Sequence, residues 1–271
     1  MTLMIRTGRA PALMAVAVSL LILAQPVGVP AQTIPELLTD LERSEFASEA
    51  WTTAFLSLVS MGGGTYDVGE SVRRVVEEHP DQRDRIATVL IRNLEQENVK
   101  RPIPWSHSPH HELYYALMGA VGSLNDPRAL PALVHMLGTG AGASRAVAAF
   151  GETAIPAVID RLERIDSHHA VRASAAQTLS FILADRPRSG FSPERQELLI
   201  DGVLRALGDD HYHVRQMALN WLPQIPDRRV RAAVERIARE DPHAVERDGS
   251  VSYPVRDRAE KWLRGGGGHV P

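Results

Sequence analysis

Hydrophobic positions recur along the chain with the spacing of an amphipathic helix, in a phrase that is itself repeated. The phrase Val-Arg-x-x-Ala-x-x-x-Leu begins at Val171, Val214 and Val255, and its arginines are 43 and 41 residues apart. On a helix its Val, Ala and Leu fall within about 80° of one another, so they form one apolar stripe with the Arg at its edge. A period of this length indicates a repeat protein built from small helical units.

A second helical pattern lies between these phrases. It occurs at residues 130–137 and 155–162, each with a proline early in the segment, where a missing N–H costs least, and again without proline at residues 198–207 and 230–238. Because the two patterns alternate, each unit is predicted to hold two antiparallel helices, a helix A and then a helix B that carries the Val-Arg phrase. The predicted fold class is all-α, an α-solenoid of stacked helix pairs.

The phrases at residues 119–133 and 149–158, together with the Val-Arg phrase, resemble HEAT repeats, in particular the variety compared with phycobilisome lyase repeats. The resemblance implies a right-handed superhelix that binds another macromolecule. It also implies a structural ladder, in which an Asp ahead of helix B and an Arg in its first turn form hydrogen bonds between successive units. The residues that match this ladder are Asp166 with Arg172, Asp210 with Arg215, and Asp248 with Arg256.

The match is good over residues 110–264 and poor over residues 32–109. The earlier part still has helix-like spacing at residues 34–41, 47–58, 68–78 and 86–94, so it is interpreted as degenerate N-terminal repeats, as terminal repeats often are. Five to six helical pairs are expected. The closing residues 265–271, rich in glycine, are expected to form a flexible tail.

The first 31 residues have the layout of a secretory signal peptide. Arg6 and Arg9 precede an acid-free apolar run over residues 11–24, and a small-residue stretch ends at Ala31, after which cleavage is expected. The apolar run is shorter than the roughly 20 residues of a membrane-spanning helix. The protein is therefore expected in the periplasm or outside the cell, with no stable membrane insertion after cleavage; the alternative is an uncleaved anchor.

Charge and composition narrow the classes of partner. The 271 residues include 30 Lys+Arg and 33 Asp+Glu and no cysteine, and the net charge is −3. Nothing in this balance favours nucleic acid, and the absence of cysteine excludes disulfides, thiolate metal ligands and Cys nucleophiles. The sequence has no Gly-x-Ser-x-Gly, His-Glu-x-x-His or Walker phrase. A non-catalytic scaffold without a cofactor is therefore expected, with another protein as its partner.

The predicted contact surface is the polar face of the B helices. Gln177, Asn220 and Lys261 occupy one equivalent helical position, and Gln216 and Asp257 occupy another. The alternative interpretation is an ordinary solvated face. A further alternative is an envelope component that associates with itself through the open ends of the solenoid.

Histidines gather ahead of the B helices, in three groups that repeat stacking is expected to bring to one edge. The first group, His107, His110 and His111 with Glu112, is the only local set spaced to hold a metal, and it supports the alternative of a metal-binding protein or metal-assisted enzyme. Exposed or helix-capping histidines are the simpler interpretation. The other two groups are His168 with His169, and His211 with His213.

Overall fold

The computed structural model describes residues 32–64, 67–101, 110–164, 168–185 and 190–265. The predicted signal peptide and its cleavage site, residues 1–31, lie outside the described residues, as do His107, Asp166 and most of the predicted tail. Within the described ranges no helix is long and apolar enough to cross a membrane.

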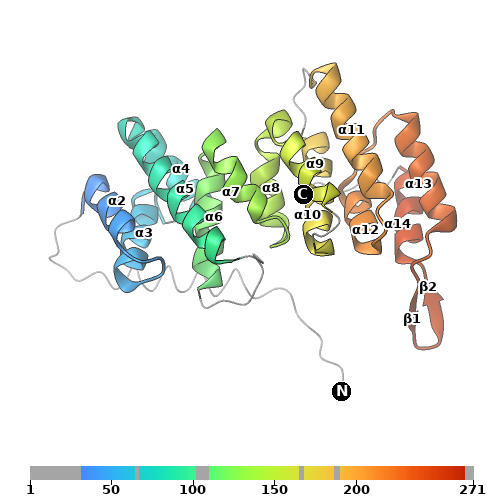
Figure 1. Cartoon of the computed structure of the whole chain (residues 1–271), viewed down its shortest axis with the longest axis horizontal. Coiled ribbons are helices and arrows are strands. Elements are labelled where there is room, and N and C mark those ends of the chain that lie inside the picture. The colour runs from blue at the N-terminus through green and yellow to red at the C-terminus, as the bar shows by residue number, and fades with distance from the viewer. Residues whose placement is uncertain (1–31, 65–66, 102–109, 165–167, 186–189, 266–271) are drawn as a thin grey trace. The chain divides into compact units, whose positions relative to one another are not determined.

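The described chain is mostly helical, as predicted, with one short β-hairpin (Figure 1). Side chains of Ser48, Asp67, Ser192 and Asp227 accept backbone N–H groups in the first turns of four of the helices and so fix where these begin. The α-helices are α2 (Ile34–Arg43), α3 (Glu49–Met61), α4 (Val68–Glu78), α5 (Arg83–Lys100), α6 (His111–Ser123), α7 (Leu130–His135), α8 (Ala141–Ala148), α9 (Ile155–Glu163), α10 (His169–Ala184), α11 (Pro193–Leu207), α12 (Tyr212–Trp221), α13 (Arg228–Glu240) and α14 (Pro254–Leu263). Short 3-10 turns lie at Pro80–Gln82, Pro127–Ala129 and Gly151–Thr153.

The chain divides into two compact units, with the division between Ala132 and Leu133. The boundary between degenerate and recognisable repeats, predicted from the sequence between residues 109 and 110, is a different kind of division and stays a prediction. Helix α6, the first helix after that boundary, packs against α4 and α5. It therefore shares a core with the helices that precede it.

In unit 1, α2 packs against α3 and α5, and α4 packs against α3 and α6. Trp51 on α3 is fully buried, and its indole Nε1–H donates to Oδ1 of Asn93 on α5 at 2.8 Å. The amide of Asn93 donates to the carbonyl of Val89 at 2.8 Å. The polar groups of this buried pair are thus satisfied inside the core, as buried polar groups must be.

Unit 2 is a stack of helix pairs in two layers. Helices α8, α10, α12 and α14 pack one against the next in one layer, and α9, α11 and α13 do the same in the other. Within each pair the two helices also contact each other, as α9 does α10 and α13 does α14. This is the helical-repeat solenoid predicted from the two alternating patterns.

The repeated apolar stripe lies in the core of unit 2. Val171, Val214 and Val255 are each at most 4% exposed. The two tryptophans at equivalent repeat positions differ: Trp262 is 2% exposed, whereas Trp221 is half-buried and meets Phe181 edge to face, with ring centroids 5.0 Å apart.

The β-hairpin was not predicted. Strands β1 (Val245–Arg247) and β2 (Ser250–Ser252) pair antiparallel between α13 and α14, and Figure 1 shows them extending away from these two helices. The turn between the strands places Asp248 and Gly249 at positive φ, 50° and 75°.

Candidate functional site

Unit 2 contains an Asp-x-His turn directly ahead of α12, and a second turn of the same sequence follows α13. Oδ1 of Asp209 accepts the backbone N–H of His211 at 2.8 Å, and Oδ1 of Asp241 accepts that of His243 at 3.0 Å. Such side-chain to backbone bonds are the usual means by which Asp fixes a turn. Both turns therefore fix the backbone of a histidine relative to the carboxylate two residues before it.

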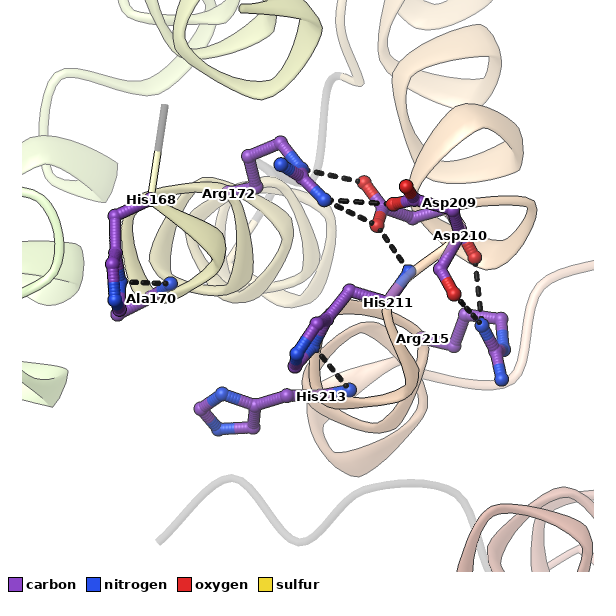
Figure 2. A network of polar contacts seen from close by, with 8 residues as sticks. All are labelled: His168, Ala170, Arg172, Asp209, Asp210, His211, His213 and Arg215. Atoms are coloured by element: carbon purple, nitrogen blue, oxygen red, sulfur yellow. Dashed lines mark hydrogen bonds and ion pairs between the residues drawn. The ribbon is translucent and has the colours of Figure 1, made fainter. Parts of the chain in front are cut away.

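Arginines of the Val-Arg phrase join these turns from one repeat to the next. Nε and Nη2 of Arg172 on α10 donate to the two carboxylate oxygens of Asp209, both at 3.0 Å, and Nη2 also donates to Asp210 at 2.8 Å. Figure 2 shows the guanidinium of Arg172 facing both carboxylates. One repeat along, Nε and Nη2 of Arg215 on α12 donate to Asp241 at 2.6 and 3.0 Å. Paired bonds of this kind between a guanidinium and a carboxylate are strong and geometrically specific.

Backbone carbonyls extend the chain of contacts. Nη1 of Arg215 donates to the carbonyls of Asp209 and Asp210 at 2.8 and 2.9 Å (Figure 2), and Nε of Arg256 on α14 donates to the carbonyl of Asp241 at 2.6 Å. Arginine and aspartate thus alternate across three successive repeats. We call this set the Arg-Asp ladder (Arg172, Asp209, Arg215, Asp241 and Arg256).

The aspartates of this ladder differ in part from those matched by the HEAT resemblance. Asp210 does bond Arg172, but its side chain is 86% exposed, and the bidentate partner of Arg172 is Asp209. The match of Asp248 with Arg256 is wrong, because Asp248 lies in the hairpin turn and Asp241 occupies the corresponding place. Asp166 lies outside the described residues.

A sequence signal for the correct aspartates exists in the Asp-x-His triplet. It occurs at residues 166–168, 209–211 and 241–243. The first two triplets begin 5 residues before the Val-Arg phrase and the third begins 14 residues before it, because the hairpin lies in between, so counting back from the phrase misses the third aspartate.

Burial and hydrogen bonding act in opposite directions on the Asp209 carboxyl. Burial raises its pKa, but the hydrogen bonds with Arg172, the backbone N–H of His211 and Asp210, together with the positive charge of Arg172, outweigh it. The net result is a pKa below the usual value for Asp, which keeps the carboxylate ionised and paired.

Two histidines cap the helices that follow them. Nδ1 of His168 accepts the backbone N–H of Ala170 at 3.2 Å at the start of α10, and Nδ1 of His211 accepts that of His213 at 3.2 Å at the start of α12 (Figure 2). A nitrogen that accepts a hydrogen bond carries no proton, so in both neutral imidazoles the hydrogen is on Nε2. The capping interpretation of these histidines therefore agrees with the structure.

The rings at these turns stack from one repeat into the next. The ring centroids of His168 and His169 are 4.1 Å apart, and those of His169 and His211 are 4.0 Å apart with planes inclined by 9°. His211 meets Tyr212 at 4.9 Å, and Tyr212 meets His243 at 3.6 Å, inclined by 8°. His213 lies beside this row, 6.0 Å from His169. We call these rings the ring edge (His168, His169, His211, Tyr212, His213 and His243).

The imidazoles of the ring edge influence one another's protonation. Burial lowers the pKa of His169, and the neighbouring imidazoles of His211, His168 and His213 lower it further. Burial also lowers the pKa of His213, with a smaller effect from His211. Both rings therefore favour the neutral form more strongly than a free histidine does.

The local set predicted to hold a metal in unit 1, around His110, His111 and Glu112, is not stacked like the rings of unit 2. His110 lies at φ 72° directly before α6, while His111 and Glu112 are exposed in its first turn. The ring of His111 lies 6.0 Å from that of Tyr115. Among the residues that the structure describes, no three His, Asp or Glu side chains are grouped to hold a metal ion. Because His107 lies outside them, the set predicted from the sequence stays a prediction.

The predicted row of polar partner-binding residues is not continuous in the structure. Gln177 on α10 is 2% exposed, Asn220 on α12 is half-buried, and Lys261 on α14 is exposed. At the second equivalent position, Gln216 is half-buried and Asp257 is exposed. The expectation that Gln177 is exposed is therefore wrong.

Small side chains explain the burial of Gln177. The Ser144 hydroxyl on α8 donates to the carbonyl of Ser174 on α10 at 3.2 Å, and the Ser180 hydroxyl donates to the carbonyl of Ala218 on α12 at 3.1 Å. Such side-chain to backbone contacts require close approach of neighbouring helices. Helix α10 is therefore enclosed by α8, α9, α11 and α12, and it is buried throughout residues 171–183.

No protein-family model matches the chain, and no curated protein matches it. Among solved structures it is similar to a designed armadillo repeat protein in complex with the peptide (KR)4, at 15% sequence identity and a TM-score of 0.45, with 86% of this chain and 99% of that chain covered. The helical-repeat architecture of the chain rests on its own helix packing, described above.

Proposed function

We propose that this protein is an exported, non-catalytic, HEAT-like scaffold that binds another protein along the ring edge of unit 2. The observation that carries the proposal is that consecutive repeats bring rings from separate turns into one continuous stack. Repeat proteins commonly bind partners through surfaces to which each repeat adds an equivalent element.

The chemistry of the ring edge suits a protein partner. Tyr212 is 37% exposed and lies between His211 and His243 in the stack. Tyrosine is enriched where interfaces are most strongly bound, because it offers a large rigid surface and a polar hydroxyl at low cost in conformational entropy. The ring edge therefore offers an anchor residue held between two neighbours.

The Arg-Asp ladder supports the same proposal through rigidity. The side chains of Arg172 and Asp209 are each 10% exposed, and that of Asp241 is 1% exposed. Because these pairs fix the turns that carry His211 and His243, the rings are positioned before a partner arrives. A preformed surface loses less conformational freedom on binding, which leaves more of the interaction free energy for affinity.

Export is proposed from the sequence of residues 1–31. Arg6 and Arg9 are the charged residues of this segment, so cleavage after Ala31 leaves a net charge of −5, two units below the −3 of the whole chain. An acidic protein in the periplasm or outside the cell fits a protein partner better than a nucleic acid.

The non-catalytic role is proposed because the sequence has none of the common nucleophile, zinc-hydrolase or phosphate-binding phrases.

Site-specific photocrosslinking in living cells tests the proposal. A photoreactive amino acid replaces Tyr212 on the ring edge in one strain and Val99, which is 87% exposed on α5 of unit 1, in a control strain. We expect one discrete crosslinked protein from position 212 and none from position 99. When the photoreactive residue is placed in that partner instead, we expect it to crosslink back to this chain. Equal products at both positions, or none at position 212, would contradict a partner at the ring edge, and recovery of the chain in the cytoplasm would contradict export.

A further inference from the structure

We propose that Arg256 is an open end of the Arg-Asp ladder, and that it binds a carboxylate of the protein partner in the place that an aspartate of a following repeat would take. This inference rests on the proposed function, and it adds the chemical class of the residue that the partner contributes. Its basis is the repetition of one contact along the ladder, the hydrogen bonds that Arg256 leaves unused, and the exposed apolar side chains beside it.

The two earlier arginines of the ladder each bind an aspartate of the repeat that follows. Arg172 binds Asp209 through Nε and Nη2, and Arg215 binds Asp241 through the same two atoms. Arg256 holds the equivalent position of the next Val-Arg phrase, in the first turn of α14. Residues 264–271, which follow α14, include no Asp or Glu, so they cannot supply the next aspartate. The repeat pattern therefore identifies a carboxylate as the ligand that this position takes.

The guanidinium of Arg256 is held in position while part of its hydrogen-bonding capacity is unused. Its Nε donates to the carbonyl of Asp241 at 2.6 Å, and its central carbon lies 4.1 Å from the centroid of the Tyr253 ring. No described residue forms a hydrogen bond or ion pair with its Nη1 or Nη2. These two nitrogens lie side by side and match the two oxygens of a carboxylate. Arg256 is thus prepared for a bidentate contact of the kind that Arg172 and Arg215 make.

The acidic side chains of the hairpin and of α14 do not fill this place. Asp241 is bound by Arg215, and Glu260 pairs with Arg264. Three further carboxylates are exposed and form no ion pair with a described residue: those of Glu246, Asp248 and Asp257. Arg256 is half-buried and stays ionised, because arginine does not lose its proton in proteins. A carboxylate brought by a partner therefore meets a cation that no described anion neutralises.

Exposed apolar side chains accompany Arg256. Five large hydrophobic residues are exposed in the part of the chain that the structure describes, and three of them, Tyr212, Val251 and Tyr253, belong to unit 2. Tyr253 lies against the guanidinium, and Val251, which is 57% exposed, is two residues before it on β2. Arginine and tyrosine are enriched where interfaces are most strongly bound, and apolar contacts around such residues exclude water. The place therefore suits an acidic residue that has an apolar neighbour in the partner.

The open end of the ladder continues the surface that is proposed to bind the partner. The carbonyl that accepts from Arg256 belongs to Asp241, which begins the turn that ends at His243, the final ring of the ring edge. His243 stacks on Tyr212 with ring centroids 3.6 Å apart. A partner that contacts Tyr212 therefore reaches Arg256 across a single turn. A second copy of this chain is the other source of a carboxylate, and the crosslinked product distinguishes the two.

Photocrosslinking in living cells at a second position of the full chain tests the inference. The photoreactive amino acid replaces Asp257, the exposed neighbour of Arg256, in three backgrounds. These are wild type, Arg256→Gln, and the control Arg236→Gln, which removes an exposed arginine of α13 that forms no ion pair with a described residue. We expect position 257 to capture the same protein as position 212 in the wild-type and control backgrounds. In Arg256→Gln we expect about tenfold less of it, because the partner's carboxylate loses its counterion.

The captured partner then allows a double-mutant cycle on the purified proteins. Mass spectrometry of the crosslinked product locates the Asp or Glu of the partner nearest to position 257, which is replaced by Asn or Gln. We expect this change and Arg256→Gln each to raise Kd about tenfold, and the two together to raise it no further, because both remove the same contact. A purely structural role of Arg256 would make the two losses multiply. Arg256→Lys keeps the charge without the fork, so its Kd should lie between those of wild type and Arg256→Gln, with circular dichroism showing that all variants are folded.

Four results would overturn the inference. These are undiminished capture at position 257 in Arg256→Gln, equal losses in Arg256→Gln and Arg236→Gln, independent losses in the double-mutant cycle, and capture of a second copy of this chain in place of the partner. They are separable from failure of the proposed function. A partner that is captured at position 212 but does not depend on Arg256 leaves the scaffold role standing, whereas absence of the crosslink at position 212 removes the partner and the inference with it.

Discussion

Arg215 and Asp241 form a bidentate ion pair between two successive repeats of unit 2. Nε of Arg215 donates to Oδ2 of Asp241 at 2.6 Å and Nη2 donates to Oδ1 at 3.0 Å, with the Asp241 side chain 1% exposed. Asp241 also accepts the backbone N–H of His243, so one carboxylate connects the helix α12 to the turn that presents a ring of the ring edge. Stability and the proposed binding surface therefore depend on the same side chain.

Replacing Asp241 tests this dependence. Asp241→Asn removes the charge opposite a buried guanidinium, and loss of one partner of a buried ion pair costs about 3 to 5 kcal/mol in the free energy of unfolding. We expect a loss of this size, measured by urea denaturation followed by circular dichroism. The matched control is Asp248→Asn in the exposed hairpin turn, for which we expect a change within about 0.5 kcal/mol. Equal losses for the two variants would contradict the assignment of Asp241 to the Arg-Asp ladder.

The capping role of His211 predicts a difference between two substitutions at one position. His211→Ala and His211→Asn both remove the ring from the stack, but Asn keeps an oxygen that can accept the N–H of His213. A helix N-cap of this kind is worth about 1 kcal/mol, so the Asn variant should be more stable than the Ala variant by that amount. Thermal unfolding of both proteins measures the difference, and identical stabilities would show that His211 does not cap α12.

The lowered pKa values of His169 and His213 predict a loss of stability on acidification. Below the ordinary histidine value of about 6.5, the unfolded chain takes up protons that the folded chain still resists, so the free energy of unfolding falls as the pH drops from about 7 through the folded pKa values. Urea denaturation between about pH 7.5 and 5 is the measurement. His169→Gln combined with His213→Gln should flatten this dependence, while His79→Gln combined with His111→Gln should leave it unchanged. A double variant at His169 and His213 that follows the wild-type curve would refute this origin of the pH effect.

The sequence predicts the solenoid well because each helix of unit 2 carries its own apolar stripe. Val171, Val214 and Val255 are buried, as the repeated phrase indicates, since helical spacing alone decides which side of a helix is apolar. The candidate site is predicted less well. The sequence placed histidines ahead of successive B helices, but the continuous stack depends on how close the repeats approach, which no single helix encodes.

Two errors have definite physical causes. The hairpin at Val245–Ser252 is inserted between α13 and α14. The aspartate nearest to the Val-Arg phrase in sequence, Asp248, therefore lies in the hairpin turn and does not take part in the ladder. The wheel that placed Gln177 on an exposed face assumes the same surroundings for every helix B. Helix α10 instead has close neighbours on both sides, because Ser144 and Ser180 allow direct contact between side chain and backbone.

Two glycines of unit 1 predict opposite effects of the same substitution. A Cβ atom on Gly62, at the end of α3, would lie 1.9 Å from the backbone carbonyl oxygen of Ser71 on α4, which is far inside van der Waals contact. The backbone of α4 cannot move without disturbing its packing against α3 and α6, so Gly62→Ala should destabilise the protein by about 3 kcal/mol or more.

Gly119 lies inside α6, and a Cβ atom there meets nothing within 4 Å. Gly119→Ala should therefore stabilise the protein by about 0.5 to 1 kcal/mol, because alanine has the higher helix propensity. Urea denaturation of the two variants beside wild type checks both signs, and a stabilising Gly62→Ala would show that α3 and α4 do not approach as closely as the structure places them.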